Sequence, residues 1–222
     1  MEKILSTVLS VSIVILGSYI LLEPEMLNAE LGPGAGPYSQ TIAATLTVNE
    51  EISMSTTTDI AMPAMGVTVN SSAGGDSTHG TWTIKTNNVD GWEVKFHAST
   101  TPALQSASST FADYHSTSGI PSLWSVNASA VEFGFSALGN KVLTMYASST
   151  DTLCTSTNNY TPNNHLQYMA FSGVTDILLA QDTGKTATAG ISTTLCVAAG
   201  QNGVYATSGV YTANITATGA VK

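Results

Sequence analysis

Arginine is absent from this chain of 222 residues, and charged residues of every kind are scarce. Six lysines stand against fifteen acidic residues, so the net charge is −9, and only 9% of the residues are charged, where about 25% is usual. Surfaces that bind nucleic acids are enriched in Lys and Arg, and bidentate hydrogen bonding to phosphate depends on Arg. The composition therefore argues against nucleic acid as a partner.

Patterns typical of catalytic and metal sites are also missing. The chain has four histidines, at positions 79, 97, 115 and 165, and no two of them have the helical spacing of metal ligands. Asp113, His115 and Ser118 lie close together in the sequence, but no G-x-S-x-G motif accompanies them. We expect no enzymatic activity, no metal site and no cofactor.

One long apolar run, residues 4–22, follows Lys3 and contains no charge. As a helix it would extend about 28 Å, close to the thickness of a bilayer core. A cleavable signal usually has a shorter apolar core and two small residues before the cleavage site, and the best site here, after Ala29, has Leu27 at the first of those positions. Residues 1–29 are thus either a cleaved signal peptide or a retained anchor helix, in which case only residues 4–22 contact the membrane. Both alternatives predict export to the cell surface or the extracellular space.

Serine and threonine dominate the rest of the chain and account for 58 of the 222 residues. A Gly/Pro-rich stretch, residues 30–37, predicts a linker, and residues 38–222 have the length and apolar content of a single β domain. Weakly charged surfaces repel one another little, which suits extracellular β proteins that pack side by side.

Residues 38–48 alternate between apolar and hydroxyl side chains. Ile42, Ala44, Leu46 and Val48 share one face of an extended chain, and the other face carries Thr41, Thr45 and Thr47. A period of two predicts a half-buried strand. Because this strand follows a linker, residues 41–48 are a candidate donor strand that pairs with the sheet edge of a neighbouring molecule.

A second alternating unit covers residues 81–96. Trp82 and Ile84 alternate with polar residues, as do Trp92, Val94 and Phe96, and the connection between them contains Asp90-Gly91. Asp-Gly in a short connection between alternating runs favours a β-hairpin. We predict that Trp82 and Trp92 face each other on its buried side, with Glu93 on its wet side.

Further alternating runs indicate the fold class. They cover residues 131–135, 142–146, 166–170, 177–180, 185–198 and 210–221. With turn residues between them, they predict an all-β chain, an Ig-like antiparallel β-sandwich of about eight to ten strands preceded by the N-terminal hydrophobic helix. Glu132 is expected on a solvent-facing side of this sandwich.

The two cysteines, Cys154 and Cys196, are consistent with an oxidising compartment. Cys154 lies in a polar loop and Cys196 on the hydroxyl-bearing face of the predicted strand 185–198, so we predict a surface disulfide. Closing a loop of this size would contribute about 4 kcal/mol in the chain-entropy model. The alternative is a pair of free buried thiols.

Two kinds of surface feature remain. Asn70, Asn159 and Asn214 are accessible N-x-[ST] sequons and candidate glycan attachment sites, although a chain rich in Asn, Ser and Thr also forms such sequons by chance. Trp124 lies outside any clear strand and is a candidate ligand-facing aromatic, the alternative being a lid over the core.

Three short segments resemble secreted bacterial surface β-sandwich proteins of the spore-coat-protein-U-like, WxL-like and fimbrial types. They are residues 45–54, the 81–96 unit with its N-x-x-x-G-aromatic turn, and the closing stretch 209–218, while the W-x-L motif itself is absent. The resemblance implies a structural or adhesive role at the cell surface. Our first hypothesis is a subunit of a pilus, fibre or sheath that polymerises with its own copies by strand addition. The alternative is a monomeric adhesin that binds cell-wall or host glycans.

Overall fold

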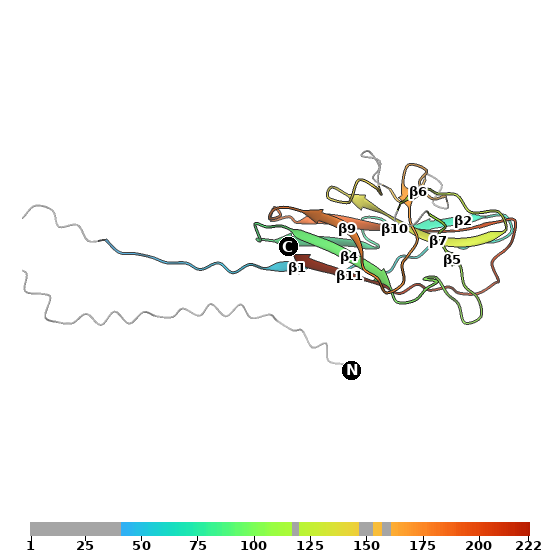
Figure 1. Ribbon diagram of the computed structural model, residues 1–222, viewed down its shortest axis with the longest axis horizontal. Helices are drawn as coiled ribbons and strands as arrows, with labels where there is room; N and C mark the ends of the chain where they lie inside the picture. The colour runs from blue at the N-terminus through green and yellow to red at the C-terminus, as the bar shows by residue number, and fades with distance from the viewer. Residues whose placement is uncertain (1–40, 117–119, 147–152, 157–160) are drawn as a thin grey trace, which may run out of the picture. The chain divides into compact units, whose positions relative to one another are not determined.

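The computed structural model describes residues 41–116, 120–146, 153–156 and 161–222. Within these ranges it has eleven strands and no helix, so the predicted all-β class is confirmed (Figure 1). Val48–Lys222 forms one compact unit, called the β domain below, and Met1–Thr47 belongs to a second. The regions predicted as signal or anchor (1–29) and linker (30–37) lie outside the described residues. In the part of the chain that the structure describes, no helix is long and apolar enough to cross a membrane.

The strands of the β domain form two larger sheets and a short ribbon. One sheet has the order β1 (Ile52–Met54), β3 (Thr81–Thr86), β10 (Ile191–Asn202), β7 (Ala130–Gly139), β5 (Ala112–Asp113), and β2 (Ser71–Gly74) also pairs with β10. The other has the order β11 (Ile215–Val221), β4 (Trp92–Ala98), β9 (Ile177–Asp182), and β6 (Ser122–Leu123) pairs with β8 (Gln167–Tyr168) in the ribbon. The strand pairs are antiparallel except β5–β7, so the first sheet is mixed.

Side chains of both larger sheets meet in one core. The first sheet contributes Trp82, Phe135 and Leu195, and the second contributes Phe96 and Leu179. The Phe96 and Phe135 rings make an edge-to-face contact with centroids 4.5 Å apart, which is a favourable arrangement of aromatic pairs. The two sheets therefore pack face to face.

The predicted hairpin over residues 81–96 is wrong, although the inward faces of its strands are correct. Trp82 and Trp92 are both buried, but β3 pairs with β1 and β10 while β4 pairs with β11 and β9. The Asp90-Gly91 connection crosses from one sheet to the other. Trp82 belongs to the main core and Trp92 to a separate cluster with Ile84 and Val94, so the two indoles do not face each other across a hairpin.

The central strands β7 and β10 are buried on both faces, which the sequence interpretation missed. Their outer face is covered by a second cluster that contains Tyr114, Leu166 and Tyr168. Glu132, expected in solvent, is consequently buried, with its side chain only 4% exposed. The covering segments explain the difference, because they turn the outward positions of β7 into interior ones.

Cys154 and Cys196 form the predicted disulfide, with Cα atoms 5.1 Å apart. The predicted surface position is wrong, since both residues are fully buried in the second cluster. Cys196 does have the predicted parity, opposite to Leu195 and Val197, but that face of β10 is the covered one. The disulfide thus holds the covering layer onto the sheet from inside.

Strand boundaries differ from the sequence prediction at several places: the run predicted over 142–146 is in no strand, and the run predicted over 210–221 is a strand only from Ile215. The described part of the predicted strand 38–48, residues 41–48, is in no strand of the chain, and its side chains are exposed. The strand predicted over 185–198 begins only at Ile191, after Gly190, whose φ of 83° fits a turn. The C-terminal run has the predicted parity, with Ile215 and Ala217 half-buried and Thr216 and Thr218 exposed.

Candidate functional site

The most exposed apolar side chains of the β-rich chain include those of residues 41–48. Ile42 is 90% and Leu46 86% exposed, and Val48 is exposed as well. Monomeric proteins rarely leave several large apolar side chains in a row in water, and such patches mark interaction sites. We call residues 41–48 the exposed segment. Its alternation of apolar and hydroxyl side chains is typical of a strand, although it belongs to no strand of the structure.

The exposed segment joins the β domain at a defined point. The backbone N–H of Glu51 donates to Oδ1 of Asn87 at 2.7 Å, and Nδ2 of Asn87 donates to the carbonyl of Asn49 at 2.7 Å. The hydroxyl of Thr86 donates to the carbonyl of Glu51 at 2.6 Å. These bonds fix residues 49–51, which immediately precede β1, next to the C-terminal end of β3, where Asn87 follows the strand.

A groove of about 460 Å³ opens into the core at the other end of β3. Two chain segments far apart in the sequence border it, residues 57–62, which follow β1, and residues 211–216, which lead into β11. The groove is lined by the core residues Trp82, Leu104, Phe133, Leu195 and Val197, each at most 8% exposed, together with polar residues of both borders. Its volume is in the range of pockets that hold a ligand.

The groove exists because β1 is short. Where β1 is present, its side chains reach β11: a Cβ built on Gly219 would lie 3.6 Å from Sδ of Met54 and 3.7 Å from Cδ1 of Ile52. Beyond Met54 the regular ladder with β3 ends, although Ser55 N–H still donates to the carbonyl of Thr83 at 3.0 Å. Residues 57–62 and 211–216 border the groove there.

The backbone of residues 211–215 has a free edge along this groove. Thr212 exchanges both of its backbone hydrogen bonds with Gln105, at 2.8 and 3.1 Å, and the carbonyl of Asn214 accepts from Ser99 N–H at 2.9 Å. Because the direction of backbone groups alternates along an antiparallel strand, the N–H and C=O groups of Tyr211, Ala213 and Ile215 point the other way. Ile215 begins β11, an edge strand of its sheet, and Tyr211 and Ala213 precede it in the chain.

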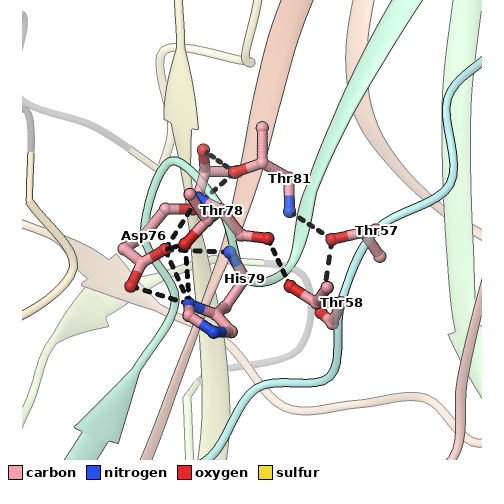
Figure 2. A network of polar contacts seen from close by, with 7 residues as sticks. Thr57, Thr58, Asp76, Thr78, His79 and Thr81 are labelled. Atoms are coloured by element: carbon pink, nitrogen blue, oxygen red, sulfur yellow. Dashed lines mark hydrogen bonds and ion pairs between the residues drawn. The ribbon is translucent and has the colours of Figure 1, made fainter.

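A polar network holds the opposite border in place (Figure 2). The hydroxyl of Thr57 accepts a hydrogen bond from Thr81 N–H at 2.8 Å. The carbonyl of Thr58 accepts one from Gly80 N–H at 3.1 Å, and the hydroxyl of Thr58 donates to the carbonyl of Thr78. Farther along this border, Ile60 packs onto Gly80, where a Cβ would lie 2.4 Å from Cδ1 of Ile60. Glycine at position 80 is what allows residues 57–62 to approach the sheet so closely.

Asp76 organises the turn beneath this border. Its carboxylate accepts from the backbone N–H groups of Thr78 and His79 at 2.7 and 2.8 Å and from the Thr78 hydroxyl at 2.7 Å, and His79 Nδ1 lies 2.9 Å away (Figure 2). The hydrogen bond from the Thr78 side chain, followed by that from its backbone, holds the pKa of Asp76 well below its ordinary value. The carboxylate is therefore charged, and able to accept these hydrogen bonds, over the whole physiological pH range.

The residues noted for catalysis do not converge. The carboxylate of Asp113 accepts from Ala103 N–H at 2.9 Å, and burial raises its pKa. His115 instead pairs with Glu132, and Ser118 lies outside the described residues. Among the residues that the structure describes, no group of three His, Cys, Asp or Glu side chains is placed to hold a metal ion.

Trp124 lies on the second cluster rather than at the groove. Its ring stacks on Tyr114 at 4.9 Å and meets the edge of Tyr168 at 5.1 Å, and it is half-buried. One face of the indole is thus occupied by the protein itself. This position is that of a lid over the outer face of β7 and β10.

The sequons at Asn70 and Asn214 are exposed, and Asn214 borders the groove. Asn159 lies outside the described residues. The groove had not been predicted, because nothing in the patterns of residues 57–62 or 211–216 shows that the two stretches meet. No protein-family model, curated protein or solved structure matches this chain.

Proposed function

We propose that this protein is an exported structural subunit, with an Ig-like β-sandwich body, that assembles with its own copies at the cell surface by β-strand addition. The observation that carries the proposal is the exposed segment, a period-two apolar stretch without a sheet of its own, anchored to the β domain at Asn87. Strand addition supplies such a segment with both a backbone partner and a place for its apolar face.

The energetics favour insertion into a core over contact with a flat surface. Full burial of Ile42, Leu46 and Val48 is worth about 1.5 to 3 kcal/mol each, so about 5 to 9 kcal/mol together. Association costs about 4 to 15 kcal/mol in lost freedom, which apolar burial alone barely offsets. Backbone hydrogen bonds to an edge strand would supply the remainder.

Export is supported by two features of the chain. The buried disulfide between Cys154 and Cys196 fits an oxidising environment outside the cytoplasm, and the apolar run 4–22 fits a membrane-directed leader. The Thr-rich, weakly charged surface allows copies to lie side by side with little repulsion.

The test is assembly with and without the exposed segment. We expect negative-stain microscopy of cells that export the full chain to show filaments or a layer, and we expect deletion of residues 30–48 to abolish them. A matched pair of point variants refines the test: Leu46→Asp should prevent assembly and Thr47→Asp, one residue on and on the opposite face, should not. Since neither residue packs in the β domain, both variants should keep its melting temperature. If the chain that lacks residues 30–48 assembled like the full chain, assembly by strand addition would be ruled out.

A further inference from the structure

We propose that the groove bordered by residues 57–62 and 211–216 receives residues 42–48 of a second copy of this chain, so that copies join head to tail. This inference rests on the strand-addition function proposed above and names the surface that accepts the exposed segment. It commits to one occupant, a second copy, for the three reasons that follow.

The groove and the segment have complementary chemistry. The groove is lined by the buried apolar residues Trp82, Leu195 and Val197 and has, along one border, the free backbone edge of Tyr211, Ala213 and Ile215. An inserted strand that pairs with this edge directs alternate side chains into the core. The segment offers Ile42, Ala44, Leu46 and Val48 at that spacing.

Charge does not oppose the insertion. Residues 41–48 contain no charged side chain, and Asp59 is the one charged residue among those that line the groove. The nearest acids on the chain, Glu50 and Glu51, follow the segment and remain at the Asn87 anchor. The segment therefore brings no charge of its own into the groove, and Asp59 is exposed.

Chain length favours a second copy over the same copy. The anchor at Asn87 follows the last residue of β3, and the groove lies beside Gly80 and Trp82 at its beginning. Six residues of strand separate Gly80 from Thr86, or about 20 Å at 3.3 Å per residue. A segment that turned back along its own domain would need about six residues to cover this distance. Residues 43–48 would then lie along β3 and could not enter the groove.

Head-to-tail contacts follow from this separation. Segment and groove are different surfaces of one molecule, so each copy that donates its segment leaves its own groove open for the next. Such heterologous contacts generate rings or open filaments rather than closed dimers.

The experiment is disulfide trapping in the full-length chain, expressed in cells that export it. Ala213→Cys places a thiol on the groove border, and it is combined with a single cysteine at 42, 44, 46 or 48. Cross-strand neighbours on one face have Cβ atoms close enough for a disulfide. Matched controls combine Ala213→Cys with a cysteine at Ala43, Thr45 or Thr47, whose side chains point to the opposite face.

We expect at least one of the four inward positions to give a ladder of dimers, trimers and longer species on a non-reducing gel, removed by reductant, while the outward positions give none. Filaments without a ladder from any inward position would overturn the groove assignment and leave strand addition standing. A link formed within one monomer would overturn it in favour of self-insertion. Absence of filaments from the unmodified chain would remove both the function and this inference.

Discussion

Nδ1 of His115 lies 2.8 Å from Oε2 of Glu132, whose side chain is almost wholly buried beneath the covering layer of β7. The same oxygen accepts a longer hydrogen bond, 3.4 Å, from Asn127 N–H. A carboxylate in the interior needs such partners because burial without them costs free energy. His115 thus links β5 and the residues that follow it to the middle of the first sheet.

Removing the His115 imidazole, whose partner is buried, should destabilise the domain more than removing a histidine whose carboxylate partner is exposed. We expect His115→Ala to lower the free energy of unfolding by about 1 to 3 kcal/mol, the cost of leaving a buried polar group poorly satisfied. His97→Ala, which breaks a more exposed pair with Asp176 at 2.8 Å, should cost less than about 1 kcal/mol. Urea denaturation at neutral pH measures both. In the His115→Ala background, Glu132→Gln should recover part of the loss, and no recovery would mean that His115 acts through packing alone.

The two buried tryptophans should both be essential although they lie in different clusters. Trp82→Ala and Trp92→Ala should each cost about 3 to 5 kcal/mol, a large part of the about 5 to 15 kcal/mol by which a domain is stable. Lys95→Ala, on the outer face of β4, removes only a partly exposed contact with Glu93 and should leave stability almost unchanged. Secreted yield and thermal melting report both effects. If both tryptophan substitutions left stability unchanged and Lys95→Ala lowered it, the assignment of inward and outward faces to β3 and β4 would be contradicted.

Sequence periodicity predicted which side of a strand is inward but not which strand is its neighbour. Trp82 and Trp92 obey the same alternation whether β3 and β4 pair in a hairpin or face each other from two sheets, because a period of two depends only on the pleat. The Asp90-Gly91 turn signal is equally local. Pairing depends on the long-range partners β10 and β9, which no local pattern specifies.

Burial of β7 and β10 on both faces does leave a signal in the sequence. Residues 133–138 and 195–200 contain no charged side chain and consist almost entirely of apolar and small residues, which is typical of strands covered on both sides. By contrast, the groove has no local signal, since it is formed where residues 57–62 and 211–216 meet. The alternation of residues 41–48 can be recognised in the sequence, whereas the groove cannot.

The disulfide should be structural and slow to reduce. Cys154→Ala combined with Cys196→Ala should lower stability by about 2 to 5 kcal/mol. The two cysteines are 42 residues apart in the sequence, and without the disulfide the loop between them gains conformational freedom in the unfolded chain. Alanine is the suitable replacement because a serine hydroxyl at Cys196 would be buried without a designed partner. Both sulfurs are inaccessible, so dithiothreitol should reduce the native protein far more slowly than the urea-unfolded protein, as measured by thiol labelling. Equal rates would show that the covering layer opens freely.

The Asp76 turn should make the border of the groove sensitive to acid. Hydrogen bonds from Thr78, and then from His79, lower the pKa of Asp76 in the folded protein below its ordinary value of 3.8. A lowered folded pKa means that the carboxylate's contribution to stability is fully present above about pH 4 and is lost as the pH falls from there toward the folded value. Asp76→Asn removes the titrating group, so the difference in unfolding free energy between the natural chain and this variant should shrink steadily below pH 4. Denaturant titrations at intervals from pH 6 to pH 2.5 measure this difference, and one that stays constant across the range would show that the charge of Asp76 does not stabilise the turn.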